Sequence, residues 1–132
     1  MGDSDSQLNR FLRRQPTLGE GVYLARTAVV VGDVTIGDYS SVWYHAVLRG
    51  DINYITVGAY SNIQDGAAIH LADEYPCEIG DWVTVGHCAV VHACKVGDEC
   101  LFTWCNLTLS FGVVDHFLFL SISDCVALRT LV

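Results

Sequence analysis

The chain has few basic residues: seven Lys and Arg stand against fifteen Asp and Glu in 132 residues, a formal net charge of -8. Such an acidic surface argues against binding to nucleic acid or to an anionic membrane. The chain also lacks the long uncharged apolar run that a membrane span requires, so we expect no membrane insertion. Residues 1–15 contain no apolar core of a secretory signal. We therefore expect a cytoplasmic protein whose six cysteines are reduced thiols.

Turn signals of the kind that separate the strands of hairpins are also scarce, which argues against a β-sandwich. What the sequence does contain is a rhythm of aliphatic residues with a spacing of six, broken by two interruptions. A helix cannot sustain this period, and a flat strand would show a period of two. These guide residues are Val30, Ile36, Val42, Leu48, Val57, Ile63, Ile69, Ile79, Val85 and Val91.

A period of six is typical of a coil with three short flat faces, each of which contributes one strand and one corner. We therefore predict an all-β fold, a single-stranded parallel β-helix of hexapeptide repeats in the form of a triangular prism. Residues 22–100 would form this domain, after an N-terminal extension of residues 1–21. A β-sandwich with accidental spacing is the alternative.

The coil predicts which polar residues become neighbours. Every third guide residue lies on the same face, one coil higher and about 4.8 Å away. His70 and His92 each follow such a guide, so they should be stacked on one face, with Arg49 one coil below them. His87 should lie near a corner of another face, above Asp65.

Three imidazoles are a typical ligand set for Zn²⁺ that leaves a fourth position open for water. A single coil cannot easily bring His87 round to His70 and His92. In a trimer with three-fold symmetry, His70 and His92 of one subunit would meet His87 of its neighbour. The alternative is that each histidine is only a surface or interface residue.

Three segments resemble the γ-class carbonic anhydrase family, whose members are trimers of left-handed β-helices: LRGD (48–51), SNIQDGAAIH (61–70) and VGHCAVVH (85–92). The resemblance implies a left-handed helix, a homotrimer, and carbon dioxide and bicarbonate as substrate and product. It implies Zn²⁺, or Fe²⁺ as in some relatives, bound by His70 and His92 with His87 of the next subunit. Residues 22–100 would then be a metal-binding domain.

The resemblance also implies roles for five polar residues. Arg49, Asp51 and Asp65 would form ion pairs at the subunit interface. Gln64 and Asn62 would lie beside the metal, where an amide can orient bound water or bicarbonate.

The family's chemistry needs a route for a proton. Three neutral ligands lower the pKa of zinc-bound water to about 7, and the resulting hydroxide attacks carbon dioxide. A positioned acid or base usually removes the proton. Active relatives carry a glutamate after LRGD, where this chain has Ile52. Asp73, three residues beyond His70, is the remaining shuttle candidate. A solvated loop carboxylate is the alternative reading of Asp73.

Reversible hydration of carbon dioxide by a carbonic anhydrase is thus the expected function. A non-catalytic zinc-bound scaffold or assembly subunit is the first alternative, favoured by Ile52. A hexapeptide-repeat acyltransferase, which would use a histidine as base on an acyl-CoA thioester, is the second.

The six-residue rhythm stops at about residue 101. Residues 101–132 form a tail rich in Leu, Phe, Val and Ser, with Arg129 as its one basic residue. We expect this tail to come from a frameshift, a mis-spliced end or a truncated gene model, with a genuine divergent cap as the alternative. The coil that carries His92 would then be the last, and its backbone groups would be uncovered.

Overall fold

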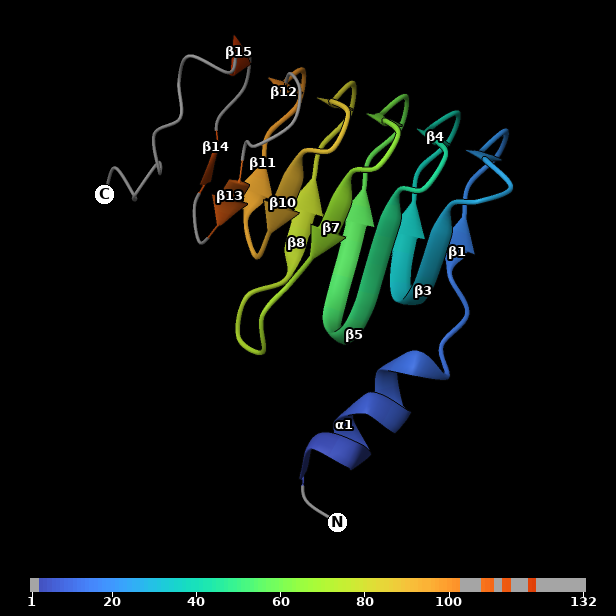
Figure 1. Ribbon diagram of the computed structural model, residues 1–132, viewed down its shortest axis with the longest axis vertical. Helices are drawn as coiled ribbons and strands as arrows, with labels where there is room; N and C mark the ends of the chain where they lie inside the picture. Colours follow the sequence, from blue (N-terminus) through green and yellow to red (C-terminus); the bar gives the residue numbers. More distant parts are fainter. Residues whose placement is uncertain (1–2, 103–107, 111–112, 115–118, 121–132) are drawn as a thin grey trace.

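The computed structural model describes residues 3–102, 108–110, 113–114 and 119–120, in which short strands follow one another in stacked coils (Figure 1). Every strand pair is parallel, and the pairs form three ladders. The first face contains residues 29–32 of β3 (Val29–Ile36), residues 47–50 of β5 (Val47–Val57), β7 (Ala68–His70), β10 (Val90–His92) and β13 (Thr108–Ser110). The second face contains β1 (Thr17–Leu18), residues 34–36 of β3, residues 55–57 of β5, β8 (Cys77–Ile79), β11 (Lys95–Val96) and β14 (Val113–Val114). The third face contains β2 (Tyr23–Leu24), β4 (Ser41–Val42), β6 (Asn62–Ile63), β9 (Thr84–Val85), β12 (Leu101–Phe102) and β15 (Phe119–Leu120).

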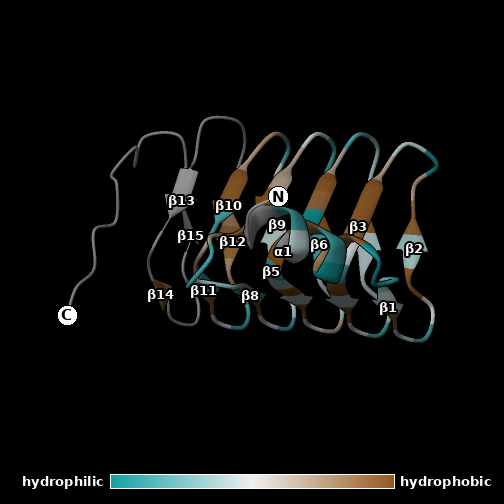
Figure 2. Ribbon diagram, turned by 90° about the horizontal axis from the view of Figure 1, so that it is seen from below, coloured by the Kyte–Doolittle hydropathy of each residue, from teal (hydrophilic) through white to brown (hydrophobic). Residues whose placement is uncertain are grey.

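The guide residues form the core between the three faces. Every guide from Ile36 to Val91 is buried, and Val30 packs against the same cluster while partly exposed. Figure 2 shows the result, with apolar colour on the strands and polar colour at many of the corners. A spacing of six places one inward side chain on each face, so the core is continuous along the helix. The predicted all-β fold, a parallel β-helix of hexapeptide repeats, is confirmed.

The glycines that follow the guides allow successive coils to approach closely. A Cβ added at Gly58 would lie 2.5 Å from the carbonyl carbon of Gly80 and 2.2 Å from Oδ1 of Asp81. The Asp81 carboxylate already accepts a hydrogen bond of 2.7 Å from the backbone N–H of Ala59. Any larger residue at Gly58 would therefore push two coils apart.

The corner between the second and third faces carries a stack of exposed aromatic rings. Tyr39, Tyr60 and Trp82 occupy equivalent positions in successive coils, each with a positive φ of 55–57°. The rings of Tyr39 and Tyr60 are stacked with centroids 5.5 Å apart, and those of Tyr60 and Trp82 with centroids 4.4 Å apart. We infer that this stacking helps to offset the cost of the left-handed backbone at these positions.

The two interruptions of the repeat lie in neighbouring coils at the corner between the first and second faces. The first lies inside β5, between the part that pairs with β7 and the part that pairs with β8. The second is the loop of residues 71–76, between β7 and β8. Residues outside the repeat therefore gather next to the end of β7, where His70 lies.

The ladders extend on both sides of residues 22–100. Before them, β1 pairs with β3, and α1 (Asp3–Leu12) contacts β3 and β5. After them, Phe102 is fully buried in the register position opposite Val85. Among the described residues, no helix is long and apolar enough to cross a membrane.

The expectation that the coil of His92 is the last is wrong, because β13 pairs with β10 and sets Ser110 opposite His92. The six-residue rhythm is harder to recognise here for two reasons. Phe102 is an aromatic guide, and the inward positions Val96 and Leu109 follow the preceding ones by five and seven residues. Most of residues 101–132 lie outside the described residues, so the origin proposed for this tail stays a prediction.

Candidate metal centre

His70 and His92 lie side by side on the first face. Each ends its strand, and β7 and β10 pair in the register that sets His92 opposite His70. The centroids of the two rings are 5.4 Å apart, with an angle of 42° between the ring planes. Both side chains point outward because the guide residue before each of them fills the core. The structure thus brings two imidazoles from residues 22 positions apart to one place, as the repeat phase predicts.

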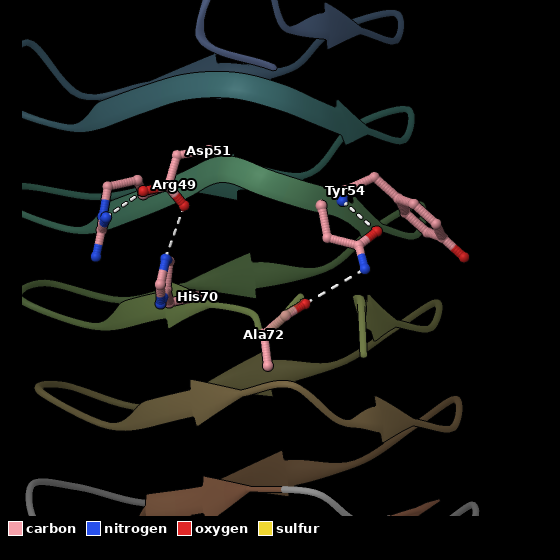
Figure 3. Close-up of polar contacts among 6 residues, drawn as sticks. Arg49, Asp51, Tyr54, His70 and Ala72 are labelled. Carbon is pink, nitrogen blue, oxygen red and sulfur yellow. Dashed lines mark hydrogen bonds and ion pairs between the residues drawn. The ribbon is translucent and has the colours of Figure 1, made fainter. Parts of the chain in front are cut away.

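A buried carboxylate lies directly beside this pair. Oδ1 of Asp51 accepts a hydrogen bond of 2.8 Å from Nε2 of His70, and Oδ2 forms an ion pair with Arg49 (Figure 3). Burial by itself would raise the pKa of Asp51. The hydrogen bond from His70 and the charge of Arg49 outweigh burial and hold the pKa below its ordinary value. Asp51 therefore stays ionised and fixes the orientation of the His70 ring.

The surroundings of His92 favour its neutral form. Its pKa is lowered first by burial and then by the neighbouring charge of His70, while a hydrogen bond to the backbone of Leu71 acts in the opposite direction. A neutral imidazole has a free lone pair for a metal ion, whereas an imidazolium has none. The surroundings of His92 therefore favour the protonation state that a metal ligand needs.

His87 lies elsewhere, close to the corner between the third and first faces. Its Nδ1 is 3.3 Å from Oδ2 of Asp65, and both side chains are about half exposed, at 52% and 45%. The structure therefore places His87 with Asp65 and not with His70 and His92. Within the described part of one chain, no group of three His, Cys, Asp or Glu side chains comes together to hold a metal.

Asn62 and Gln64 lie on the side of the coil that carries His87. Asn62 is in β6 on the third face, and Gln64 follows that strand directly. The Asn62 side-chain amide donates to Oγ of Ser41 at 2.8 Å, but its Oδ1 is buried with no hydrogen-bond partner among the described residues. A buried acceptor without a partner is costly within a folded chain.

Ile52, at the position of the family glutamate, packs against the hydrophobic core. Asp73, the candidate proton shuttle, is exposed on the 71–76 loop. Sequence reasoning overlooked Asn53, which contacts this loop. Its Nδ2 donates to the carbonyl oxygens of Ala72 and Asp73, at 3.3 and 3.0 Å. The repeat phase indicates that the first interruption lies beside the second, but it does not give the side-chain contacts between them.

The chain is similar to several known proteins. Residues 15–50 match the family model described as bacterial transferase hexapeptide (six repeats). The chain is 55% identical over 84 residues to a probable carbonic anhydrase of Methanocaldococcus jannaschii, covering 64% of this chain and 53% of that protein. It is 47% identical over 107 residues to gamma carbonic anhydrase 2, mitochondrial, of Arabidopsis thaliana, covering 76% of this chain and 38% of that protein.

A solved structure of a hexapeptide-repeat protein is also similar to this chain. The crystal structure of a hexapeptide transferase family protein from Anaplasma phagocytophilum is 30% identical with a TM-score of 0.62, and the similarity covers 79% of this chain and 72% of that one. The chain spans about half the length, or less, of these two carbonic anhydrases. The repeat, its three faces and these similarities together show that the chain belongs to the hexapeptide-repeat proteins, in the γ-class carbonic anhydrase family.

Proposed function

We propose that this chain forms the repeat domain of a carbonic anhydrase that converts carbon dioxide and water reversibly to bicarbonate at a metal ion shared between subunits. The observation that carries the proposal is the pair of His70 and His92, side by side on one face with the ionised Asp51 against His70. The names of the relatives support the same activity.

The residues of this chain fit a Zn²⁺ ion, with Fe²⁺ as the second choice. His70 and His92 would supply two imidazole ligands, and His87 of a neighbouring subunit would supply the third. A homotrimer with three-fold symmetry would build three such sites. The exposed position of His87 at another corner supports this assembly.

The interface would also use the charged residues around the histidines. Arg49 and Asp51 already form an ion pair within the chain, and Asp65 is paired with His87. We propose that in the assembled trimer these residues face the neighbouring subunit. Their carboxylates would then hold the imidazoles in fixed orientations, an effect that strengthens metal binding.

The chemistry divides between the metal and the chain. When bound, the metal acts as a Lewis acid that lowers the pKa of water to about 7. Asp51 fixes the ring of His70, and burial keeps His92 neutral. The amides of Gln64 and Asn62 would orient water and bicarbonate, and the carboxylate of Asp73 would accept the released proton.

One observation favours a second candidate, a non-catalytic zinc-bound scaffold. Ile52 packs against the core at the position that follows LRGD, so it brings no acid or base to the site. A scaffold needs the three histidines but no proton shuttle. An acyltransferase stays the third candidate, because the similar solved structure is described as a hexapeptide transferase family protein.

Metal analysis combined with stopped-flow carbon dioxide hydration tests the proposal. The wild type should contain zinc or iron and accelerate hydration, whereas His70→Ala should lose both. The control is His45→Asn, which changes an exposed histidine at φ 62°, a conformation that Asn tolerates. Metal without hydration would support the scaffold, and absence of metal from the wild type would refute the site.

A further inference from the structure

Asn53 and Tyr54 lie in the first interruption of the repeat, and both contact the chain one coil above them. The Asn53 side chain donates to the backbone carbonyls of Ala72 and Asp73, and its own Oδ1 accepts from the N–H of Tyr54 at 2.9 Å. The Nδ2 group therefore joins β5 to the start of the 71–76 loop, while Oδ1 holds the side chain against the backbone of β5. A side chain that donates to two neighbouring carbonyls restrains the position of that backbone segment, and we call such a side chain an anchor.

Tyr54 holds the far end of the same loop. Its hydroxyl donates to Oε1 of Glu78 at 2.8 Å, and Glu78 lies in β8, directly after the loop. The Glu78 carboxylate also forms an ion pair of 3.6 Å with Lys95 of β11. Two adjacent residues of β5 thus contact the entry and the exit of the loop separately.

Between these anchors the loop forms a tight turn. The backbone N–H of Ala72 donates to the carbonyl of Tyr75 at 3.0 Å, and the N–H of Tyr75 donates back to Ala72 at 3.2 Å. Asp73 and Glu74 form the tip of this turn, and both are exposed. Because the tip buries little surface, the hydrogen bonds to the carbonyls at its base contribute to fixing its position.

We propose that Asn53 is a positioning residue that holds this turn, here called the acidic turn (residues 72–75), so that Asp73 stays within reach of the site on His70. This inference rests on the proposed function. Asn53 itself would not touch the reacting atoms. One water molecule would give up a proton, the Asp73 carboxylate would take it and become a carboxylic acid, and a buffer base would remove it again.

Steady-state kinetics with varied buffer separate this role from a purely structural one. Hydration itself determines kcat/KM, whereas transfer of the proton to buffer contributes to kcat. In dilute buffer, Asn53→Ala should lower kcat roughly tenfold and leave kcat/KM within about twofold, since positioned proton transfer contributes factors of this order or larger. A high concentration of imidazole buffer should restore kcat, because the small base replaces the displaced carboxylate.

A double-mutant cycle with Asp73→Asn identifies the partner through which Asn53 acts. If Asn53 works through Asp73, the double variant should have the same kcat as Asp73→Asn alone. Tyr54→Phe is the matched control, because it removes the contact at the far end of the loop and leaves the Asp73 contact in place. A parallel fall of kcat and kcat/KM in Asn53→Ala, or a full further loss in the Asp73→Asn background, would overturn the inference.

Amide hydrogen exchange tests the anchor without any activity measurement. Exchange of residues 72–75 should be faster in Asn53→Ala than in the wild type or in Tyr54→Phe. Unchanged exchange would refute the anchor even in an active enzyme. If exchange is faster in Asn53→Ala but the wild type does not hydrate carbon dioxide, Asn53 is an anchor without a catalytic role. The proposed function, and not the contact of Asn53 with the loop, would then be wrong.

Discussion

Replacement of Phe102 by alanine tests whether the segment after residue 100 closes the core. Phe102 is fully buried and is the largest of the completely buried side chains in the described part of the chain. It lies opposite Val85 on the third face, and its carbonyl accepts a hydrogen bond of 2.7 Å from Gly86. Removing roughly 150 Å² of ring surface from the core, at about 25 cal/mol per Å², gives a loss of about 4 kcal/mol. Measured Phe→Ala substitutions in protein cores cost a similar ~3–5 kcal/mol.

Urea unfolding followed by circular dichroism would measure this loss. The slope of the transition should stay the same while its midpoint falls. Leu101→Ala is the control, because Leu101 precedes Phe102 in β12 but is only half buried on the outer side of the coil. A Phe102→Ala variant within about 1 kcal/mol of the wild type would show that the segment after residue 100 does not complete the third face.

Three further predictions follow from the packing and charges. Gly58→Ala should destabilise the fold by about 1–3 kcal/mol in urea unfolding, because its Cβ would clash with the backbone of Gly80. Trp82→Ala should cost about 0.5–1.5 kcal/mol in the same assay beyond any loss of buried area, since its ring stacks on Tyr60. The pKa of Asp51 is lower in the folded chain than in the unfolded chain. The contribution of its carboxylate to the free energy of unfolding is therefore complete above the unfolded pKa of ~3.9, and it is lost as the pH falls through the pKa of the folded chain. The stability difference between wild type and Asp51→Asn should therefore shrink on acidification, and a difference that grows would contradict the lowered pKa.

The repeat phase alone was sufficient to place His70 beside His92 and Asp65 beside His87, because a period of six fixes which residues share a face. The repeat is recognised from aliphatic residues spaced by six, so the sequence does not show how far the prism continues once a guide is aromatic and the spacing is no longer six. Phe102 is such a guide, and the ladder beyond it was missed.

The contacts of the two interruptions could not be read from the sequence for a related reason. Residues 51–54 and 71–76 have no repeat phase of their own, so their side chains cannot be assigned to a face. The two hydrogen bonds from Asn53 to the loop depend on the height of one coil above another, and only three-dimensional stacking supplies that.

Mixing two inactive variants tests the central claim, that each metal site is shared between two copies of the chain. His87→Ala retains His70 and His92, and His70→Ala retains His87, so neither variant should bind metal alone. Assembled together from the unfolded state, some interfaces would contain all three histidines, and metal content measured by mass spectrometry should recover to a fraction of the wild-type value. Metal content that stays at zero in a mixture shown to form mixed oligomers, or full metal binding by His87→Ala alone, would contradict a site built between subunits.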